Sequence, residues 1–165
     1  MRRICLYAGS FDPMTVGHLN IVERLCAQFD HVIVAICKNA KKPGYMEPEA
    51  QLRSVTEAIA HLRNAEAIQS LTGLTVDLAR KHGATVLARG LRSVTDFEYE
   101  ANLAQFNAHV APDIETMFLL ADPKVSFISS SGVRTLHALG ASIQGLVPPA
   151  VESALCGDDK QGKEK

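Results

Sequence analysis

The stretch Ala8–His18, AGSFDPMTVGH, combines residue types that can bind phosphate. Gly9 allows a ligand to approach the backbone closely, and Ser10 offers both a hydroxyl and a backbone N–H group. Gly17 and His18 fall at the start of the helical pattern that follows, where free N–H groups and the positive end of the helix dipole favour anions. We therefore expect a phosphate-binding loop that presents a histidine.

A plainer explanation of this stretch is also open, because glycine and proline are common in turns. On that view Gly9, Pro13 and Gly17 only shape the loop, and His18 is a capping or surface residue. Three other stretches with similar chemistry favour phosphate binding. They are ARGLR with Arg89 and Arg92, FISSSGVR with Ser129, Ser130, Ser131 and Arg134, and NAKKPG with Lys41 and Lys42.

Each of these stretches is weak evidence by itself, because serine clusters usually cap helices and paired lysines usually lie in solvent. Their chemistry is nevertheless consistent. Two guanidinium groups can hold separate phosphates, and N–H groups at the start of a helix bind anions. If the preceding strands are parallel, all of these loops lie at one edge of the sheet and form a single site.

The rest of the chain supplies such a sheet, because strand-like and helix-like patterns alternate along it. This alternation predicts a single-domain, Rossmann-like α/β fold with a doubly wound, five-stranded parallel sheet and helices on both faces. We expect the domain to span residues 1–157 and the polar residues 158–165 to form a disordered tail. The strand patterns are ICLYA, HVIVAIC, AEAIQS, ATVLARG and ETMFLLA.

Composition limits the classes of function. The chain has 165 residues, 47% of them hydrophobic and 21% charged, and a net charge of −1, so neither nucleic acid nor a membrane is an expected partner. It contains no signal peptide pattern and no apolar run of about 20 residues, which favours a cytoplasmic protein. The four cysteines lack C-x-x-C spacing, so we expect no protein metal site and no disulfide.

These motifs resemble those of a known superfamily. GSFDPMTVGH matches the G-[ST]-F-D-P-x-[TH]-x-G-H loop of the nucleotidylyltransferases, and FISSSGVR is similar to their I-S-S-[ST]-x-x-R motif. With RGLRSVTDFEYE, the chain most closely resembles the phosphopantetheine adenylyltransferase family, to which Thr15 also points, since related families generally carry His there. The resemblance implies adenylyl transfer from ATP to 4'-phosphopantetheine, which gives dephospho-coenzyme A and pyrophosphate in the penultimate step of coenzyme A biosynthesis.

The resemblance also implies roles for individual residues. The substrate phosphate attacks in line, so no side chain has to act as nucleophile and no covalent enzyme intermediate forms. The implied catalytic residues are His18, Lys42, Ser10 and Arg92. The implied ATP-binding residues are Ser10, Phe11, His18, Gly90, Leu91, Arg92, Glu100, Val125, Ser129, Ser130 and Ser131. The implied phosphopantetheine-binding residues are Ser10, Lys42, Leu74, Thr75, Arg89, Leu103 and Asn107.

The helical pattern after ARGLR places Asp96, Glu100, Leu103 and Asn107 on one face, at i, i+4, i+7 and i+11. We expect this face to border both the nucleotide and the pantetheine arm. Other faces of the helix are apolar, and two explanations stay open: burial between the sheet and its neighbours, or contact within a homo-oligomer. The resemblance implies a hexamer, and it implies Mg²⁺ that is carried by ATP.

Three positions depart from the usual pattern of the family, and two other functions stay open. Val125 replaces a larger, often aromatic residue, Thr75 stands where the pantetheine wall is more often apolar, and Gln51 replaces a common arginine. One alternative function is a related nucleotidylyltransferase with another phosphorylated acceptor, such as a mononucleotide or a glycerol phosphate. The other alternative is a non-catalytic module that binds adenylates.

Overall fold

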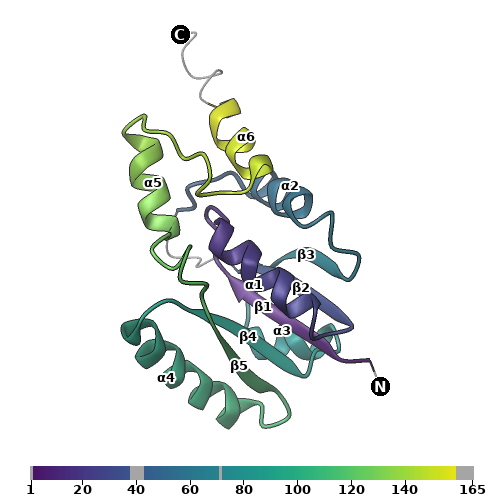
Figure 1. The fold of residues 1–165 in the computed structure, drawn as a ribbon. Coiled ribbons are helices and arrows are strands. Elements are labelled where there is room, and N and C mark those ends of the chain that lie inside the picture. The colour runs from purple at the N-terminus through teal and green to yellow at the C-terminus, as the bar shows by residue number, and fades with distance from the viewer. Residues whose placement is uncertain (1, 38–42, 71, 159–165) are drawn as a thin grey trace.

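The computed structural model describes residues 2–37, 43–70 and 72–158, and within them it contains five parallel strands with helices on both faces (Figure 1). The strand order is β3-β2-β1-β4-β5, which confirms the predicted doubly wound sheet. The strands are β1 (Ile4–Gly9), β2 (His31–Cys37), β3 (Ala65–Ser70), β4 (Val86–Leu91) and β5 (Glu115–Leu120).

The helices divide between the two faces of the sheet. Those that follow β1 and β2, namely α1 and α2, cover one face, and α6 packs against α2. Those that follow β3 and β4, namely α3 and α4, cover the other face (Figure 1). The helices are α1 (Val16–Cys26), α2 (Pro48–Ala58), α3 (Thr75–Lys81), α4 (Val94–Val110), α5 (Ser130–Ala138) and α6 (Pro149–Asp158).

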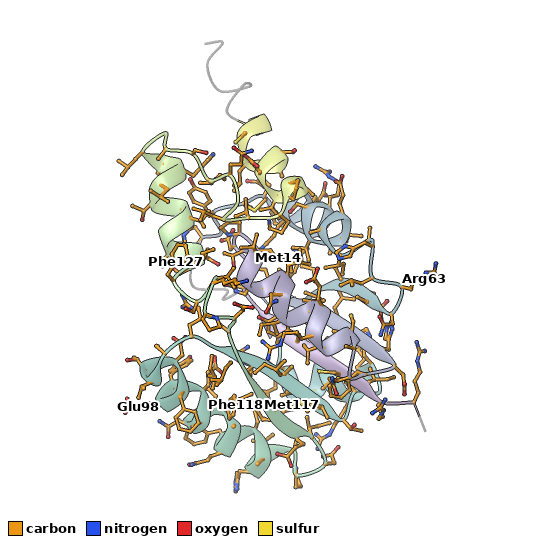
Figure 2. The ribbon with its side chains drawn as sticks, viewed as in Figure 1. Met14, Arg63, Glu98, Met117, Phe118 and Phe127 are labelled. Atoms are coloured by element: carbon orange, nitrogen blue, oxygen red, sulfur yellow. The ribbon has the colours of Figure 1, made fainter. Side chains whose placement is uncertain are left out.

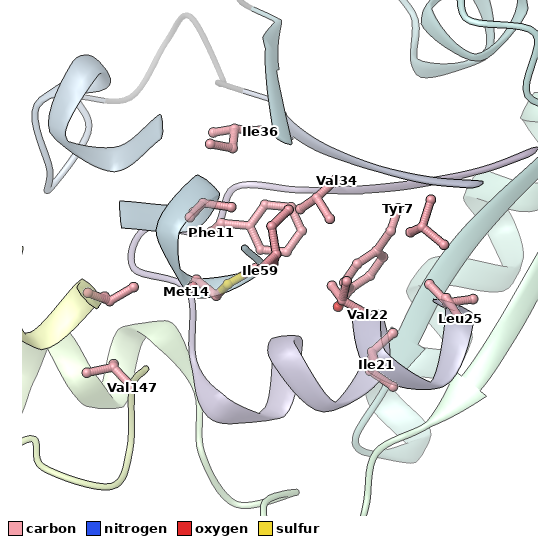
Figure 3. Packing of buried hydrophobic residues seen from close by; sticks show 14 of the residues in the cluster. Tyr7, Phe11, Met14, Ile21, Val22, Leu25, Val34, Ile36, Ile59 and Val147 are labelled. Atoms are coloured by element: carbon pink, nitrogen blue, oxygen red, sulfur yellow. The ribbon is translucent and has the colours of Figure 1, made fainter. Parts of the chain in front are cut away.

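The central strand β1 shows how the sequence builds two cores. Successive side chains of a strand point to opposite faces, so Cys5 and Tyr7 enter the core under α1, whereas Leu6 and Ala8 enter the core beside α3. The ring of Phe11, from the loop after β1, belongs to the α1 core with Tyr7 (Figure 3). The strand is therefore buried on both faces, as expected for a parallel sheet.

The order in which strands are added to the sheet reverses beside β1, and this positions the site. The connection after β1 crosses one face of the sheet through α1, while the connection after β4 crosses the opposite face through α4. The carboxyl ends of β1 and β4 are adjacent, so a crevice opens between them at the point where ligands bind in such folds. The loop after β1 and the end of β4 both border this crevice.

Two boundaries differ from the sequence prediction. The predicted strand ATVLARG ends at Gly90, whereas β4 runs from Val86 to Leu91, because Leu91 also pairs with Leu120 on β5. At the C-terminus, the sequence places a disordered tail from residue 158, whereas Asp158 is the last residue of α6. The helix thus extends one residue into the segment that was predicted to be a disordered tail. Residues 159–165 lie outside the described part of the chain.

The surface of α4 and β5 is unusually apolar. Every residue of α4 is at least partly exposed, so burial within one chain does not account for its apolar stripes. Figure 2 shows Met117 and Phe118 on β5, an edge strand of the sheet. The ring of Phe118 packs against Phe97 of α4, whereas Met117 points to the opposite face, because successive side chains of a strand alternate. The large apolar residues exposed on these two elements are Val94, Phe97, Tyr99, Leu103, Phe106, Val110, Met117 and Leu120.

Candidate active site

The loop after β1 folds over its own phenylalanine. Phe11 has a φ of 44°, in the left-handed region, and its ring is buried against Tyr7 and His18 with centroid distances of 5.2 and 5.1 Å. A Cβ atom on Gly9 would lie 3.1 Å from Cζ of this ring, closer than ordinary packing allows. The Phe11 ring, rather than a ligand, therefore occupies the space that Gly9 leaves open.

A buried amide supports this loop from behind. Gln51 of α2 is 1% exposed, and its Nε2 donates hydrogen bonds of 2.6 and 2.7 Å to the carbonyl groups of Ser10 and Phe11. Two otherwise buried acceptors are satisfied in this way, which matters because an unpaired buried carbonyl is costly. The residue that departs from the family pattern at position 51 thus has a structural role.

His18 is fixed by the cap of α1. Thr15 is the N-cap residue; its Oγ1 accepts the backbone N–H of His18 at 3.3 Å, and its own backbone N–H donates to Nδ1 of His18 at 3.0 Å. Because Nδ1 accepts a hydrogen bond, the proton of the neutral ring is on Nε2. Burial, with Arg92 and Arg89 nearby, lowers the pKa of His18 to about 4. At neutral pH the ring is an uncharged donor.

Two cavities flank His18 and Arg89, one on each face of the sheet. The α1–α5 cavity, of about 330 Å³, is lined by the start of α1, the end of β4 and the N-terminus of α5. The α3–α4 cavity, of about 270 Å³, lies on the opposite face, between the N-terminus of α3 and one side of α4. A central cleft of about 200 Å³ lies between them. It is bordered by the loop after β1, by Arg89 of β4 and by Arg92, which follows the end of β4.

The structure groups most of the predicted site residues around these spaces, although their roles remain predictions. The predicted residues that line the α1–α5 cavity are Ser10, His18, Gly90, Arg92, Val125, Ser129, Ser130 and Ser131. Those that line the α3–α4 cavity are Leu74, Thr75, Arg89, Glu100, Leu103 and Asn107. Those that line the central cleft are Ser10, Phe11, His18, Arg89, Gly90, Arg92 and Glu100.

Three predicted residues do not join the site as expected. The side chain of Leu91 is buried in β4, outside the three spaces. Glu100, predicted to bind ATP, lines the α3–α4 cavity and the cleft but lies apart from the serines of α5. Lys42, like Lys41, lies outside the described residues, so its position relative to the site stays a prediction.

The two arginines are each paired with a carboxylate of α4. Arg89 donates from Nε and Nη2 to the two oxygens of Glu100, at 2.7 and 2.5 Å, and from Nη1 to the carbonyl group of Ala8. The backbone N–H of Arg92 donates to Asp96 at 3.0 Å, and its Nε lies 3.5 Å from the same oxygen. Burial alone would lower the pKa of Arg89, but its hydrogen bonds with Glu100 raise it.

The start of α5 is built around its serines. Ser129 is the N-cap residue and accepts the backbone N–H of Gly132 at 3.0 Å. Ser130 donates to the carbonyl group of Pro13 at 2.8 Å, which connects α5 to the loop after β1. Arg134, one turn further on, lines the α1–α5 cavity and donates to the carbonyl group of Asp12 at 2.7 Å. Ser129 thus caps α5 and Ser130 joins it to the loop after β1, and all three serines line the cavity.

Several residues that line the site were missed in the sequence interpretation. Tyr7 borders both the α1–α5 cavity and the cleft, and its hydroxyl lies 3.4 Å from where a Cβ on Gly90 would be. The alternation along β1 could have indicated that Tyr7 shares a face with the site. Thr15 sits in a T-x-x-H capping box, which differs from the usual form with Glu or Gln. Thr116 lines the α3–α4 cavity and carries no sequence signal.

Comparisons with known proteins agree with this architecture. The family model described as cytidylyltransferase-like matches residues 6–136. A phosphopantetheine adenylyltransferase of Geotalea daltonii is 46% identical over 153 residues, which cover 93% of this chain and 94% of the relative. The corresponding protein of Synechococcus is 45% identical over 92% of this chain and 95% of the relative. This chain belongs to the phosphopantetheine adenylyltransferase family.

The fold of this phosphopantetheine adenylyltransferase family member is also found in a more distant protein. A Vibrio parahaemolyticus protein described as a nicotinate-nucleotide adenylyltransferase superimposes with a TM-score of 0.74 at 18% sequence identity. The match covers 96% of this chain and 94% of that one. At this identity the likeness concerns the fold alone, and the substrate has to be argued from the cavities.

Proposed function

We propose that this protein transfers the adenylyl group of ATP to 4'-phosphopantetheine, giving dephospho-coenzyme A and pyrophosphate. The observation that carries this proposal is the placement of His18, Arg89 and Arg92 around a cleft between two cavities on opposite faces of the sheet. Such an arrangement suits a reaction that joins two phosphorylated molecules, because each has its own compartment and their phosphates meet at cationic and neutral donors.

ATP is assigned to the α1–α5 cavity. This space contains Arg92 and Arg134 and the N-terminus of α5, which together offer guanidinium and backbone donors for several phosphate oxygens. The acceptor is assigned to the α3–α4 cavity, where Leu103 alternates with the polar groups of Thr75 and Asn107. A pantetheine arm, in which methylene groups alternate with amides, matches that lining.

In the proposed reaction, an oxygen of the acceptor phosphate attacks the α-phosphorus of ATP. The new P–O bond forms as the bond to the β-phosphate oxygen breaks, and the electron pair leaves with pyrophosphate, so no proton transfer is required. His18 donates its Nε2–H to an α-phosphate oxygen as negative charge builds there. Ser10 and Arg92 hold the phosphates in line, and we retain Lys42 as a further phosphate contact on the strength of the family resemblance.

Magnesium is proposed to enter as part of the ATP complex. Asp96 and Glu100, the carboxylates that line the cleft, are each engaged by an arginine, and the other polar side chains there are hydroxyls, the His18 imidazole and the two arginines. This donor set suits phosphate oxygens, which themselves are the preferred ligands of Mg²⁺. The proposed Mg²⁺ is therefore part of the nucleotide substrate, and the protein contacts the phosphates around it.

We also propose that the protein is a homo-oligomer, expected to be a hexamer, that works in the cytoplasm. The exposed apolar residues of α4 and β5 support self-association, because contiguous patches of this kind usually mark interfaces. Light scattering after size-exclusion chromatography would give the number of subunits. A monomer at micromolar concentration would contradict this part of the proposal.

Incubation with ATP, Mg²⁺ and 4'-phosphopantetheine, followed by mass spectrometry, tests the proposed reaction. Dephospho-coenzyme A and an equal amount of pyrophosphate are the expected products. A parallel panel with nicotinate mononucleotide and glycerol 3-phosphate tests the alternative acceptors, and turnover with either in preference to phosphopantetheine would overturn the substrate assignment. Binding of ATP without turnover on any acceptor would favour a non-catalytic adenylate-binding module.

A further inference from the structure

Tyr7 carries a hydroxyl that forms no hydrogen bond within the described part of the chain. The residue is only 4% exposed, and its ring packs edge-on against Phe11 at a centroid distance of 5.2 Å (Figure 3). A buried hydroxyl without a partner is costly, and a ligand oxygen that accepts a hydrogen bond from it would remove that cost.

This hydroxyl lies where the α1–α5 cavity meets the central cleft. It is 3.4 Å from the place that a Cβ atom on Gly90 would take, so it reaches the end of β4. Among the described residues, five line both the cavity and the cleft: Tyr7, Ser10, His18, Gly90 and Arg92. The other four were all predicted to bind ATP, and Tyr7 is the member of this set that has no role so far.

The proposed reaction requires the α-phosphate of ATP at this same junction. The α-phosphorus has to be open to attack from the cleft while the rest of the nucleotide occupies the α1–α5 cavity. Burial raises the pKa of the Tyr7 hydroxyl, although the nearby Arg89 and Arg92 act in the opposite direction. The hydroxyl therefore keeps its proton at neutral pH and can donate it in a hydrogen bond to a phosphate oxygen.

We propose that Tyr7 is a catalytic residue whose hydroxyl donates a hydrogen bond to an α-phosphate oxygen of ATP. This inference rests on the proposed function, because that function places ATP in the α1–α5 cavity. As the bond to the acceptor oxygen forms and the bond to pyrophosphate breaks, negative charge builds on the α-phosphate oxygens. The hydroxyl stabilises this charge together with His18 and does not give up its proton. Packing against Phe11 fixes the ring before ATP binds.

Tyr7→Phe tests the proposal, because it removes the hydroxyl and keeps the ring. We expect kcat to fall about 10- to 100-fold, the usual loss for one hydrogen bond to a charged group, with the KM for phosphopantetheine within about twofold of wild type. The Tm of the ligand-free protein should stay the same or rise, because a buried hydroxyl without a partner is removed. A kcat within about threefold of wild type would overturn the proposal, whatever the change in Tm.

Tyr45→Phe is the matched control, because it removes a tyrosine hydroxyl that has a partner. The Tyr45 hydroxyl lies 2.7 Å from Nδ1 of His137, and Tyr45 lines none of the three spaces. Loss of this contact should lower the Tm slightly and leave kcat within about twofold of wild type. If Tyr45→Phe lost as much kcat as Tyr7→Phe, the effect would not be specific to the junction, and the proposal would be refuted.

Deoxynucleotides separate the α-phosphate from the ribose as the group that the hydroxyl contacts. With 2'-deoxy-ATP and with 3'-deoxy-ATP, Tyr7→Phe should lose the same fraction of kcat as with ATP, because the α-phosphate is unchanged. A much smaller loss with either deoxynucleotide would assign the hydroxyl to the ribose and contradict the proposed contact.

Failure of the proposed function gives a different result. If the wild-type protein forms no dephospho-coenzyme A, the reaction assignment is wrong, and the affinity for ATP is compared by calorimetry. A Kd for ATP that is at least about threefold higher in Tyr7→Phe than in the wild type would still support the contact. An unchanged Kd in that case would overturn it as well.

Discussion

The α1–α5 and α3–α4 cavities lie on opposite faces of one sheet, and they are built differently. Two helix N-termini shape the first cavity, with Thr15 and Ser129 as caps that sit within three residues of the groups they hold. The second cavity is assembled from β1, β4, α3, α4 and β5, which are far apart in the sequence. Both cavities depend on the whole fold, since the first also combines β1, α1, the end of β4 and α5, but among the residues that the structure describes only the first has side-chain helix caps in its wall.

The side chains that line the two cavities also differ in their chemistry. The α1–α5 cavity combines cations, hydroxyls and helix N-termini, which recognise phosphate in many different molecules. The α3–α4 cavity has one arginine, paired with Glu100, among leucines and neutral polar groups. We infer that the reaction chemistry is encoded on the α1 side, whereas the choice of acceptor is encoded on the α3–α4 side.

The largest expected effect follows from removing His18, which lines the α1–α5 cavity and the central cleft. His18→Ala should lower kcat by about 10² to 10³, because a donor to the developing charge at phosphorus is lost. Binding of either substrate, measured by calorimetry, should change by less than about threefold. His61→Ala is the matched control, since His61 bonds only Glu23 among the contacts that the structure describes. A kcat within tenfold of wild type would mean that His18 is a capping residue alone.

The arginines should separate the two cavities. Arg89→Ala should raise the KM for phosphopantetheine, and Arg92→Ala the KM for ATP, each by about tenfold to a hundredfold through loss of a charge-assisted contact. Steady-state kinetics in which each substrate is varied in turn measures both values. Equal rises in both KM values in the two variants, which a change in ionic strength reduces together, would contradict this assignment. They would show that the two arginines contribute to one general positive field and do not contact separate substrates.

The N-cap residue of α1, Thr15, should affect both the stability of the protein and its kcat, because it holds His18 in place. Thr15→Val removes the acceptor for the His18 N–H and should lower the free energy of unfolding by about 1 kcal/mol, with a fall in kcat of about five- to tenfold as His18 loses its fixed position. Denaturant unfolding and kcat are the measurements. Thr15→Ser keeps the hydroxyl and serves as the control. Wild-type kcat in Thr15→Val would show that the cap does not hold the catalytic ring.

The smallest expected effect concerns pH. Since the pKa of His18 is lowered to about 4, its ring should stay neutral, with the proton on Nε2, from pH 8 down to about pH 5. Between pH 6.5 and 4 the unfolded chain takes up a proton at this position and the folded chain does not, so His18 makes the protein less stable as pH falls. Nitrogen NMR of the protein with labelled histidine measures the protonation of each ring, and the signal of His18 is assigned by its loss in His18→Ala. A titration of that signal near pH 6.5 would contradict the lowered pKa.

The sequence predicted the α1 side of the site more fully than the α3–α4 side. The grouping of Ser10, His18 and the α5 serines follows from short motifs at strand ends, because parallel strands bring those ends together. Thr75 could be assigned only through the family resemblance, whereas Asn107 also shares a helical face with Glu100 and Leu103. Thr116 was missed, because a lone threonine in a strand has no pattern that distinguishes a cavity wall from any other position.

Other features depend on side-chain packing that no local pattern encodes. The left-handed backbone of Phe11 follows from the burial of its ring, and Gln51 reaches the loop after β1 from 40 residues away in the sequence. The pairing of Glu100 with Arg89 depends on how α4 packs beside β4, which no local pattern encodes. These contacts are set by the tertiary fold, which overrides local preference.

The two opposed cavities give the joined product a property that neither substrate has. Each substrate loses its translational freedom separately when it binds, whereas dephospho-coenzyme A would occupy both compartments as one molecule. The product then acts as a bivalent ligand whose second half binds at a high effective concentration set by the short link across the cleft. Pyrophosphate has a single compartment and no such advantage. The geometry that aligns the reactants therefore also favours retention of the organic product after pyrophosphate has left.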